Sequence, residues 1–315
     1  MSRRLTENKL ILVKRRTRLQ ELVVRYNTVQ QAQFYIERMG ADFSDYVQED
    51  QQYQQALELT LFQLQQLGRV QLLDREHVPS FIFGPDDVVV VLGQDGLVAN
   101  TMKYATGLPL IGVNPDPRRW DGVLLPFEVK DLSLLVPDVF ARKRQMRDVR
   151  LACATLNDGQ VLYGVNDLFI GRKTHVSARY ELSYSGRSEQ QSSSGIIIST
   201  GMGATGWLKS VLTGAAGIVS LAGGSEARQS LPDLSASFDW NAPYLYYSVR
   251  EPFPSRMTST ELVFGKIDGE PLRIVSQMPE EGVIFSDGVE SDYVEFNSGI
   301  SATIGIAQQR AHLVI

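Results

Sequence analysis

The segment Val88-Val89-Val90-Val91-Leu92-Gly93-Gln94-Asp95-Gly96 decides the fold of this chain. Its first five residues form an unbroken apolar run, which is typical of a parallel strand buried on both faces of its sheet. A glycine-containing turn follows at once, and residues 97–105 then show the spacing of a helix that ends before Gly107. A buried strand, a short turn and a helix in this order predict a βαβ unit and therefore an open α/β sheet.

The flanking segments continue this alternation. Residues 10–13 and 110–113 are short apolar runs with the length of buried strands. Between them, residues 28–39 and 53–67 place apolar side chains at helical spacing, and Gly40 is positioned to cap the first of these two helices. The first part of the chain is therefore predicted to alternate strands with helices.

The hydrophobic period changes to two in the second half of the chain. Residues 150–156 and 161–165 flank Asn157-Asp158-Gly159, which is a strong hairpin signal. Residues 261–267 and 272–278 flank a second glycine-containing turn. A series of such hairpins predicts a mostly antiparallel β domain.

These patterns predict three parts of the chain. We expect an α/β nucleotide-binding domain over residues 1–132, a basic connector over 133–148 and a β-rich domain over 149–315. The last strand could belong to the β-rich domain or return to the first domain, and the pattern alone leaves both open.

The composition excludes several classes of protein. Of the 315 residues, 43% are hydrophobic and 21% are charged, as in folded soluble proteins. The net charge of −5 does not favour nucleic acid as a partner. Cys153 is the only cysteine, which excludes an internal disulfide and a cysteine cluster for zinc. The three histidines are scattered along the sequence, so no metal site is predicted.

Hydropathy gives no sign of a membrane protein. No apolar run approaches the ~20 residues that a bilayer-spanning helix requires. Residues 1–5 lead into charged sequence without the apolar core of a signal peptide. We therefore expect a cytoplasmic protein with no membrane partner.

Asp95 is the first candidate for chemistry. It lies in the turn after a buried strand, at the edge where open α/β sheets bind ligands. Backbone N–H groups at the start of the following helix are suited to bind phosphate. A carboxylate at this place can act as a general base or as a magnesium ligand. The alternative is a tight turn in which Asp95 only caps the helix.

Two further segments carry polar groups at strand ends. Residues 199–207 form a glycine-rich loop, and its Trp207 could stack on a base or belong to the core. Asn166 and Asp167 follow another strand, where an amide beside a carboxylate can bind two ribose hydroxyls. A simple turn or helix cap is the alternative for this pair.

Together, these segments resemble the NAD kinase family, with the closest likeness to its mitochondrial-type branch and the bacterial relatives of that branch. Residues 93–96 resemble the family's Gly-Gly-Asp-Gly motif, and residues 166–171 resemble its Asn-Glu-Val-Phe-Ile-Gly motif. The likeness is carried, in chain order, by residues 12–18, 93–96, 112–117, 166–171, 194–207 and 285–288.

The resemblance implies a fold and an activity. The fold is an α/β N-terminal domain with a β-sandwich C-terminal domain. The activity is transfer of the ATP γ-phosphate to the 2′-hydroxyl of the adenosine ribose of NAD, which gives NADP. The resemblance also implies ATP, Mg²⁺ and NAD as cofactors, small-molecule nucleotides as partners and a homodimer.

The family's functional residues carry over to matching positions of this chain. Asp95 takes the catalytic place. The phosphate- and nucleotide-binding positions are Gly93, Gln94, Gly96 and Asn114. The NAD-binding positions, in a nucleotide site between the domains, are Asn166, Asp167, Thr200, Gly203, Thr205 and Trp207.

Several substitutions depart from the family pattern in its phosphate-handling parts. Gln94 replaces a glycine, which removes any backbone conformation with positive φ. Leu97 and Thr205 replace a threonine and a lysine, and Asp167 is one methylene shorter than glutamate. Two alternatives therefore stay open: a non-catalytic, regulatory NAD(P)-binding protein, and a lipid or small-molecule kinase of the same superfamily.

Overall fold

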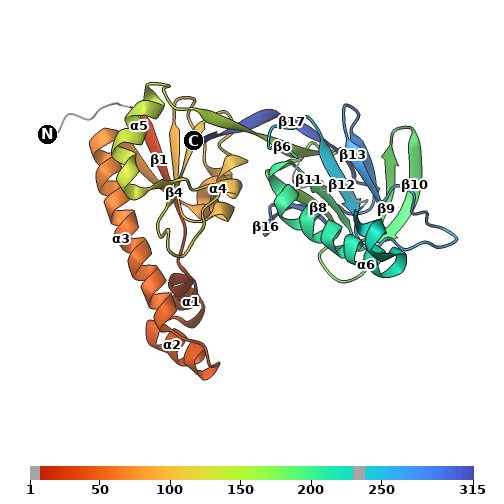
Figure 1. Cartoon of the computed structure of the whole chain (residues 1–315), viewed down its shortest axis with the longest axis horizontal. Helices are drawn as coiled ribbons and strands as arrows, with labels where there is room; N and C mark the ends of the chain where they lie inside the picture. Colours follow the sequence, from red (N-terminus) through yellow and green to blue (C-terminus); the bar gives the residue numbers. More distant parts are fainter. Residues whose placement is uncertain (1–7, 230–237) are drawn as a thin grey trace. The chain divides into compact units, whose positions relative to one another are not determined.

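The computed structural model describes residues 8–229 and 238–315 and divides the chain into two units (Figure 1). Unit 1 comprises Met1–Arg147 and Ala311–Ile315, and unit 2 comprises Asp148–Arg310. No helix in the described ranges is both long enough and apolar enough to cross a membrane.

Unit 1 is built on a parallel sheet with the strand order β17-β4-β3-β1-β2. The predicted valine strand is β3, and Val89 to Leu92 are fully buried between its two neighbours. The prediction of an open α/β sheet is therefore confirmed. The strands are β1 (Lys9–Lys14), β2 (Arg69–Asp74), β3 (Val88–Leu92), β4 (Pro109–Asn114), β5 (Phe127–Glu128), which pairs with β4, and the end of β17 (Ser301–Val314).

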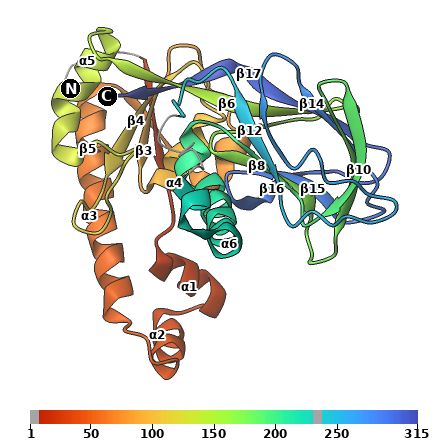
Figure 2. The same cartoon turned by 45° about the vertical axis from the view of Figure 1, so that its right-hand side comes forward.

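Helices cover both faces of this sheet, with α3 and α5 on one side and α4 on the other (Figures 1 and 2). The buried residues of α5 follow the i, i+3, i+4, i+7 spacing of an amphipathic helix and pack with α3 against the strands. The helices of unit 1 are α1 (Arg18–Tyr26), α2 (Val29–Arg38), α3 (Ser44–Leu67), α4 (Asp95–Met102) and α5 (Leu132–Phe140), with 3₁₀ turns at Arg75–Ser80 and Val129–Asp131.

Helices α1 and α2 form a hairpin with a small core of its own. Leu19 of α1 packs with Ala32 and Ile36 of α2 and with Phe43, which precedes α3. The predicted helix over 28–39 is confirmed as α2, with a threonine N-cap. Helix α1 is not predicted, because its charged sequence follows directly on a strand.

Unit 2 consists of two mainly antiparallel sheets around one core. One sheet contains β10, β9, β14 and β17 in this order, with β6 and β7 paired beside β17, and the other has the order β13-β12-β11-β8-β15-β16. Buried side chains of both sheets form one cluster, in which Tyr180, Ile198 and Ile284 are fully enclosed. The predicted antiparallel β domain is therefore confirmed.

Helix α6 follows the glycine-rich loop of unit 2. The remaining elements are β6 (Met146–Leu156), β7 (Val161–Gly164), β8 (Asp167–Arg172), β9 (Ala178–Tyr184), β10 (Arg187–Ser193), β11 (Ile196–Ser199), a 3₁₀ turn (Met202–Thr205), α6 (Trp207–Gln229), β12 (Leu245–Val249), β13 (Phe264–Ile267), β14 (Leu272–Ser276), β15 (Gly282–Ser286) and β16 (Val289–Glu295).

The loop after β4 folds back onto the strand that it leaves. A Cβ atom on Gly112 would stand 1.9 Å from the carbonyl oxygen of Leu124, so this contact requires glycine. We name residues 115–124 the β4 loop.

The close contact at Gly112 makes a stability prediction. Gly112→Ala should lower the free energy of unfolding by about 1–3 kcal/mol, because the backbone of the β4 loop must move away from the new methyl group. Thermal and denaturant unfolding measure this change. Gly214→Ala in α6 is the control, since a Cβ atom there meets no neighbour within 4 Å. Equal stability of the two variants would contradict the prediction.

Candidate functional site

The topology of unit 1 indicates where its sheet could bind a ligand. The chain passes from β1 to β2 on one side and then crosses back to β3 on the other side of β1. Open α/β sheets bind ligands at the carboxyl ends of their strands where the winding reverses in this way. Here that place lies between the residue after β1, Arg15, and the residue after β3, Gly93.

The turn Gly93–Gly96 is unstrained. Gln94 is the N-cap of α4 and has an extended backbone, with φ −117° and ψ 162°. The turn therefore needs no positive φ at this position, and the restriction that Gln94 imposes does not affect it. Gly93 is needed for space instead, because a Cβ atom there would stand 2.8 Å from a methyl carbon of Leu97.

Asp95 connects α4 to the β4 loop. Its Oδ1 accepts a hydrogen bond of 2.8 Å from the backbone N–H of Leu124, and its Oδ2 accepts one of 3.3 Å from Val123. The side chain does not cap its own helix. Both carboxylate oxygens are thus oriented by backbone donors, just after the carboxyl end of β3, where open α/β sheets bind ligands.

Asn114 holds the same loop from the end of β4. The residue is only 5% exposed, and its Nδ2 donates to the carbonyl oxygen of Trp120 at 3.0 Å. Its Oδ1 accepts from the N–H of Asp116 at 3.0 Å. The amide predicted to bind nucleotide therefore also shapes the loop that orients Asp95.

Ion pairs tie the β4 loop to the start of α3. Arg119 of the loop and Arg18 of α1 each approach a carboxylate oxygen of Asp45 at 2.6 Å. Hydrogen bonds from Arg119 and then from Arg18 hold the pKa of Asp45 well below its usual range. This carboxylate stays charged throughout the pH range in which the protein is expected to work.

Glu49 extends these ion pairs to Arg15, which lies where the winding of the sheet reverses. This buried carboxylate accepts hydrogen bonds from Arg18 and, at 2.7 Å, from Arg15. Burial raises the pKa of Glu49, but the two arginines outweigh it and the net shift is downward. Arg15 is only 9% exposed, and its Cδ lies 3.7 Å from the place of a Cβ on Gly93.

From the sequence, Arg15 could help to close a nucleotide site or be the plain end of a surface strand, and the sequence favours the second. The structure places it in the site of unit 1, where Tyr53 of α3 also accepts a hydrogen bond from its backbone N–H. The sequence signal was a basic residue directly after a buried strand.

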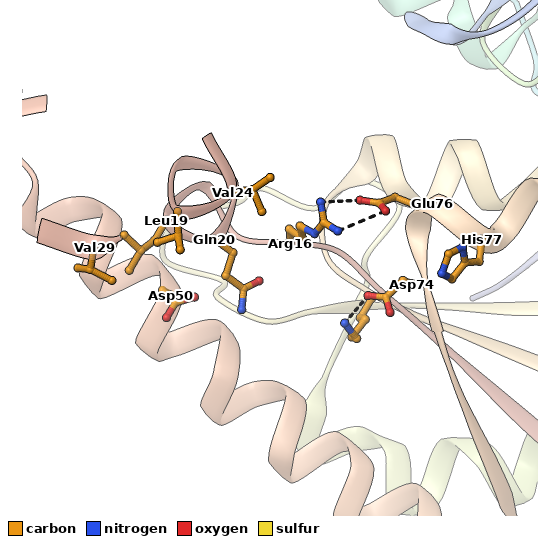
Figure 3. Close-up of a pocket in the computed structure, with 11 residues that line it drawn as sticks. Arg16, Leu19, Gln20, Val24, Val29, Asp50, Asp74, Glu76 and His77 are labelled. Carbon is orange, nitrogen blue, oxygen red and sulfur yellow. Dashed lines mark hydrogen bonds and ion pairs between the residues drawn. The ribbon is translucent and has the colours of Figure 1, made fainter. Parts of the chain in front are cut away.

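A cavity of about 550 Å³ opens beside this network at the carboxyl ends of β1 and β2 (Figure 3). Leu19 and Val24 of α1 form an apolar wall, and Gln20 and Asp50 provide polar groups. On the far side, Arg16 is paired with Glu76 at 2.8 Å, and Lys14 is paired with Asp74. The cavity thus combines an apolar wall with amide and carboxylate oxygens.

Two of the predicted residues of unit 2, Asn166 and Asp167, lie at the carboxylate of Asp287. Its Oδ1 accepts from the N–H groups of Val165 and Asn166, at 2.9 and 2.6 Å. Asp287 itself has a φ of 56°, in the left-handed region where aspartate is tolerated. Its carboxylate thereby fixes the segment that carries Asn166 and Asp167.

Thr200 and Gly203 hold the same segment from the glycine-rich loop. The Thr200 hydroxyl donates to the carbonyl oxygens of Val165 and Asn166. A Cβ atom on Gly203 would stand 2.0 Å from the carbonyl oxygen of Asn166. Both residues were predicted to bind NAD. In the structure, the Thr200 hydroxyl and the bare backbone of Gly203 contact the backbone carbonyl of Asn166.

The side chains of Asn166 and Asp167 form no hydrogen bond with any described residue. Asp167 is only 7% exposed, and burial followed by the charge of Asp287 raises its pKa from 3.8 to about 7. A buried carboxyl group without a partner and with a perturbed pKa is a mark of a binding or catalytic site.

Trp207 and Thr205 lie at the start of α6. The Trp207 ring stacks on Phe169 at a centroid distance of 5.6 Å, and Arg250 lies 5.5 Å from the Trp207 centroid. Thr205 is exposed, and its hydroxyl forms no hydrogen bond within the described ranges. Trp207 is thus part of an aromatic cluster, whereas Thr205 is accessible.

Known structures share this arrangement of elements. A yeast NADH kinase complexed with NADH superposes with a TM-score of 0.56 at 14% identity, over 98% of this chain and 84% of that one. An NAD kinase from Archaeoglobus fulgidus in complex with ATP superposes with a TM-score of 0.56 at 15% identity, over 98% and 93%. The chain has the NAD kinase fold. No family model and no curated protein matches the sequence.

The NAD kinase fold confirms the coarse prediction, an α/β domain followed by an antiparallel β domain. At this level of identity the likeness concerns the fold alone. The mitochondrial-type branch stays a prediction.

The ion pair between Arg119 and Asp45 is expected to stabilise the β4 loop. Arg119→Ala should speed hydrogen exchange at the N–H groups of Val123 and Leu124 by roughly three- to fivefold, as expected for a partly exposed ion pair worth somewhat under 1 kcal/mol. Arg118→Ala is the control, because its guanidinium has no partner in the described part of the chain. Equal exchange in both variants would contradict the coupling.

Asp167 makes a prediction for the pH dependence of stability. Between pH 3.8 and about 7 the folded protein keeps a proton that the unfolded chain releases, so stability falls as pH rises through this window. Asp167→Asn should therefore raise Tm by at least about 2 °C near pH 8, with a smaller gain near pH 5. Calorimetry at the two pH values measures the effect.

Asp158→Asn is the control for this prediction. Hydrogen bonds from Gln160 lower the pKa of this exposed carboxylate, so its replacement should bring no gain in Tm. A pH-independent effect of Asp167→Asn would contradict the raised pKa.

Proposed function

We propose that the protein is a kinase that transfers the γ-phosphate of ATP to the 2′-hydroxyl of the adenosine ribose of NAD, giving NADP. The observation that carries this proposal is the oriented carboxylate of Asp95 at the ligand-binding edge of a sheet with the NAD kinase fold.

Asp95 serves as the general base in this proposal. Its oxygens accept backbone N–H groups and keep lone pairs for the substrate hydroxyl. The hydroxyl proton passes to Asp95 while the ribose oxygen forms a bond to the γ-phosphorus. The bond from that phosphorus to the bridging oxygen breaks, and ADP leaves. Backbone N–H groups at the start of α4 face the phosphate charge.

Asn166 and Asp167 bind the acceptor in this proposal. Their side chains have no partner among the described residues, so a ribose can supply the missing hydrogen bonds. A neutral Asp167 can donate to a hydroxyl oxygen, and an ionised one can accept from a hydroxyl. Since its pKa is about 7, both forms are populated near neutral pH.

The donor nucleoside is assigned to the cavity at the ends of β1 and β2. Leu19 and Val24 offer an apolar wall for a planar base, and Gln20 and Asp50 offer oxygens to its amino group. In this proposal the phosphates are assigned to Arg15, which follows β1, and to the turn Gly93–Gly96, which follows β3. A yeast relative crystallised with NADH and an archaeal relative crystallised with ATP support nucleotides as ligands.

Magnesium enters with the phosphates of ATP in this proposal. Residues 8–229 and 238–315 contain no group of three or more His, Cys, Asp or Glu side chains that could hold a metal ion. Mg²⁺ commonly binds through substrate phosphates and one or two carboxylates, and Asp95 is the carboxylate at this place. Bound there, the ion would neutralise charge on the transferred phosphoryl group.

A non-catalytic NAD(P)-binding protein is the second candidate. It is favoured by the accessible Thr205, which stands where the family has a lysine, so that the loop lacks a cation for phosphate. A lipid or small-molecule kinase of the same superfamily is the third, and it predicts that NAD does not bind.

Replacing Asp95 tests the proposal. Purified protein with NAD, ATP and Mg²⁺ should form NADP, and Asp95→Asn should reduce kcat by at least about 100-fold, as expected for loss of a general base. NAD binding should persist in the variant, measured by calorimetry. Asp121→Asn is the control. It changes an exposed carboxylate of the β4 loop and should keep full activity.

The other outcomes separate the alternatives. No NADP, together with a Tm raised by NAD or NADP, would support the non-catalytic protein. No product and no stabilisation by either nucleotide would support a different substrate. Unchanged turnover in Asp95→Asn would refute the role of Asp95.

A further inference from the structure

A second cavity lies at the opposite ends of the strands of unit 1. Its volume is about 540 Å³, within the range of small-molecule sites. It lies at the amino ends of β3 and β4, where Val88 and Pro109 begin these strands, whereas Asp95 follows the carboxyl end of β3. The cavity is therefore separate from the site of the proposed kinase reaction.

Arg142 lines this cavity in an unusual backbone conformation. Helix α5 ends in a Schellman motif, in which Arg142 N–H donates to Val139 at 3.0 Å and Lys143 N–H donates to Asp138 at 2.9 Å. Arg142 occupies the left-handed position of this motif, with a φ of 55°. Glycine is preferred there because side chains with a Cβ atom are strained in this region.

The guanidinium of Arg142 forms no hydrogen bond or ion pair with any residue that the structure describes. The helix dipole favours a cation near this helix end, but Lys143 and Arg144 already meet that preference. Neither the helix end nor a partner within the described residues explains why this left-handed position carries arginine instead of glycine. A bound ligand would explain both the strained backbone and the guanidinium without an ion pair.

Arg144 lines the same cavity. Its buried Nε forms an ion pair with Asp138 at 3.6 Å but no hydrogen bond within the described part of the chain. Of the two carboxylates in the lining, Asp87 accepts from Gly84 N–H at 2.7 Å and lies 3.9 Å from the Lys9 ammonium. The other, Asp86, is exposed and forms no ion pair with Arg142 or Arg144.

Apart from Asn8 and His312, the rest of the lining is apolar. Val88 and Val139 are buried beneath the cavity, and Phe140 and Met146 border it. Guanidinium groups match the oxygens of phosphate and carboxylate, and the apolar wall requires a body with little charge. We propose that this cavity binds an amphipathic anion, a phosphate or carboxylate group on an apolar body, with Arg142 and Arg144 at the anionic group.

Calorimetric titration with four probes tests the proposed ligand class. Hexyl phosphate and hexanoate carry the anion and the apolar body, inorganic phosphate carries the anion alone, and hexanol carries the body alone. The wild-type chain should bind at least one amphipathic probe in a saturable manner and more tightly than both partial probes. The stronger of the two amphipathic probes identifies the anionic group as phosphate or carboxylate.

Arg142→Gly separates ligand binding from a structural role. Glycine relieves the left-handed strain, so Tm should rise by about 2–4 °C. Affinity for the amphipathic probe should fall by at least about tenfold, as expected for loss of a charge-assisted hydrogen bond. Arg142→Lys should retain part of the affinity, and Lys143→Ala, a neighbouring cation outside the lining, should retain all of it.

Three results would overturn this inference. These are no saturable binding of either amphipathic probe to the wild-type chain, equal affinity in Arg142→Gly and wild type, and an equal loss of affinity in Lys143→Ala. The inference does not rest on the kinase reaction, since none of these measurements requires turnover.

Discussion

Contact between the backbones of neighbouring segments is the constraint on which the candidate residues of both units depend. At Gly112 the carbonyl oxygen of Leu124 occupies the place of a side chain, and at Gly203 the carbonyl oxygen of Asn166 does the same. Each contact presses a loop against the end of a strand. The side chains that emerge from these loops are thereby held at fixed positions without large apolar anchors of their own.

Carboxylates complete both arrangements by accepting backbone N–H groups from a loop distant in the sequence. Asp95 holds Val123 and Leu124, and Asp287 holds Val165 and Asn166. An ionised carboxylate suits this task, because its two oxygens offer several acceptor sites and no donor. Loss of charge at Asp95 would therefore affect the geometry of the β4 loop as well as the proposed proton transfer.

Local patterns of hydrophobic and turn residues predicted individual strands and hairpins. The valine run predicted the central strand of unit 1, and Asn157-Asp158-Gly159 predicted the first hairpin of unit 2. The supports of the site were not predictable in this way. Arg15 meets Glu49, 34 residues away, and Asp287 caps a segment about 120 residues before it. Such pairings depend on the finished topology, and no local period records them.

The discontinuity of unit 1 has a consequence for synthesis of the chain. Its sheet includes the end of β17, where His312 and Leu313 pair with Pro109 and Leu110 of β4. Unit 2 is continuous in sequence and lies between the two pieces of unit 1. On the ribosome, unit 2 can therefore fold while β4 still lacks one neighbour. The sheet that carries Asp95 is completed only after residues 311–315 have emerged.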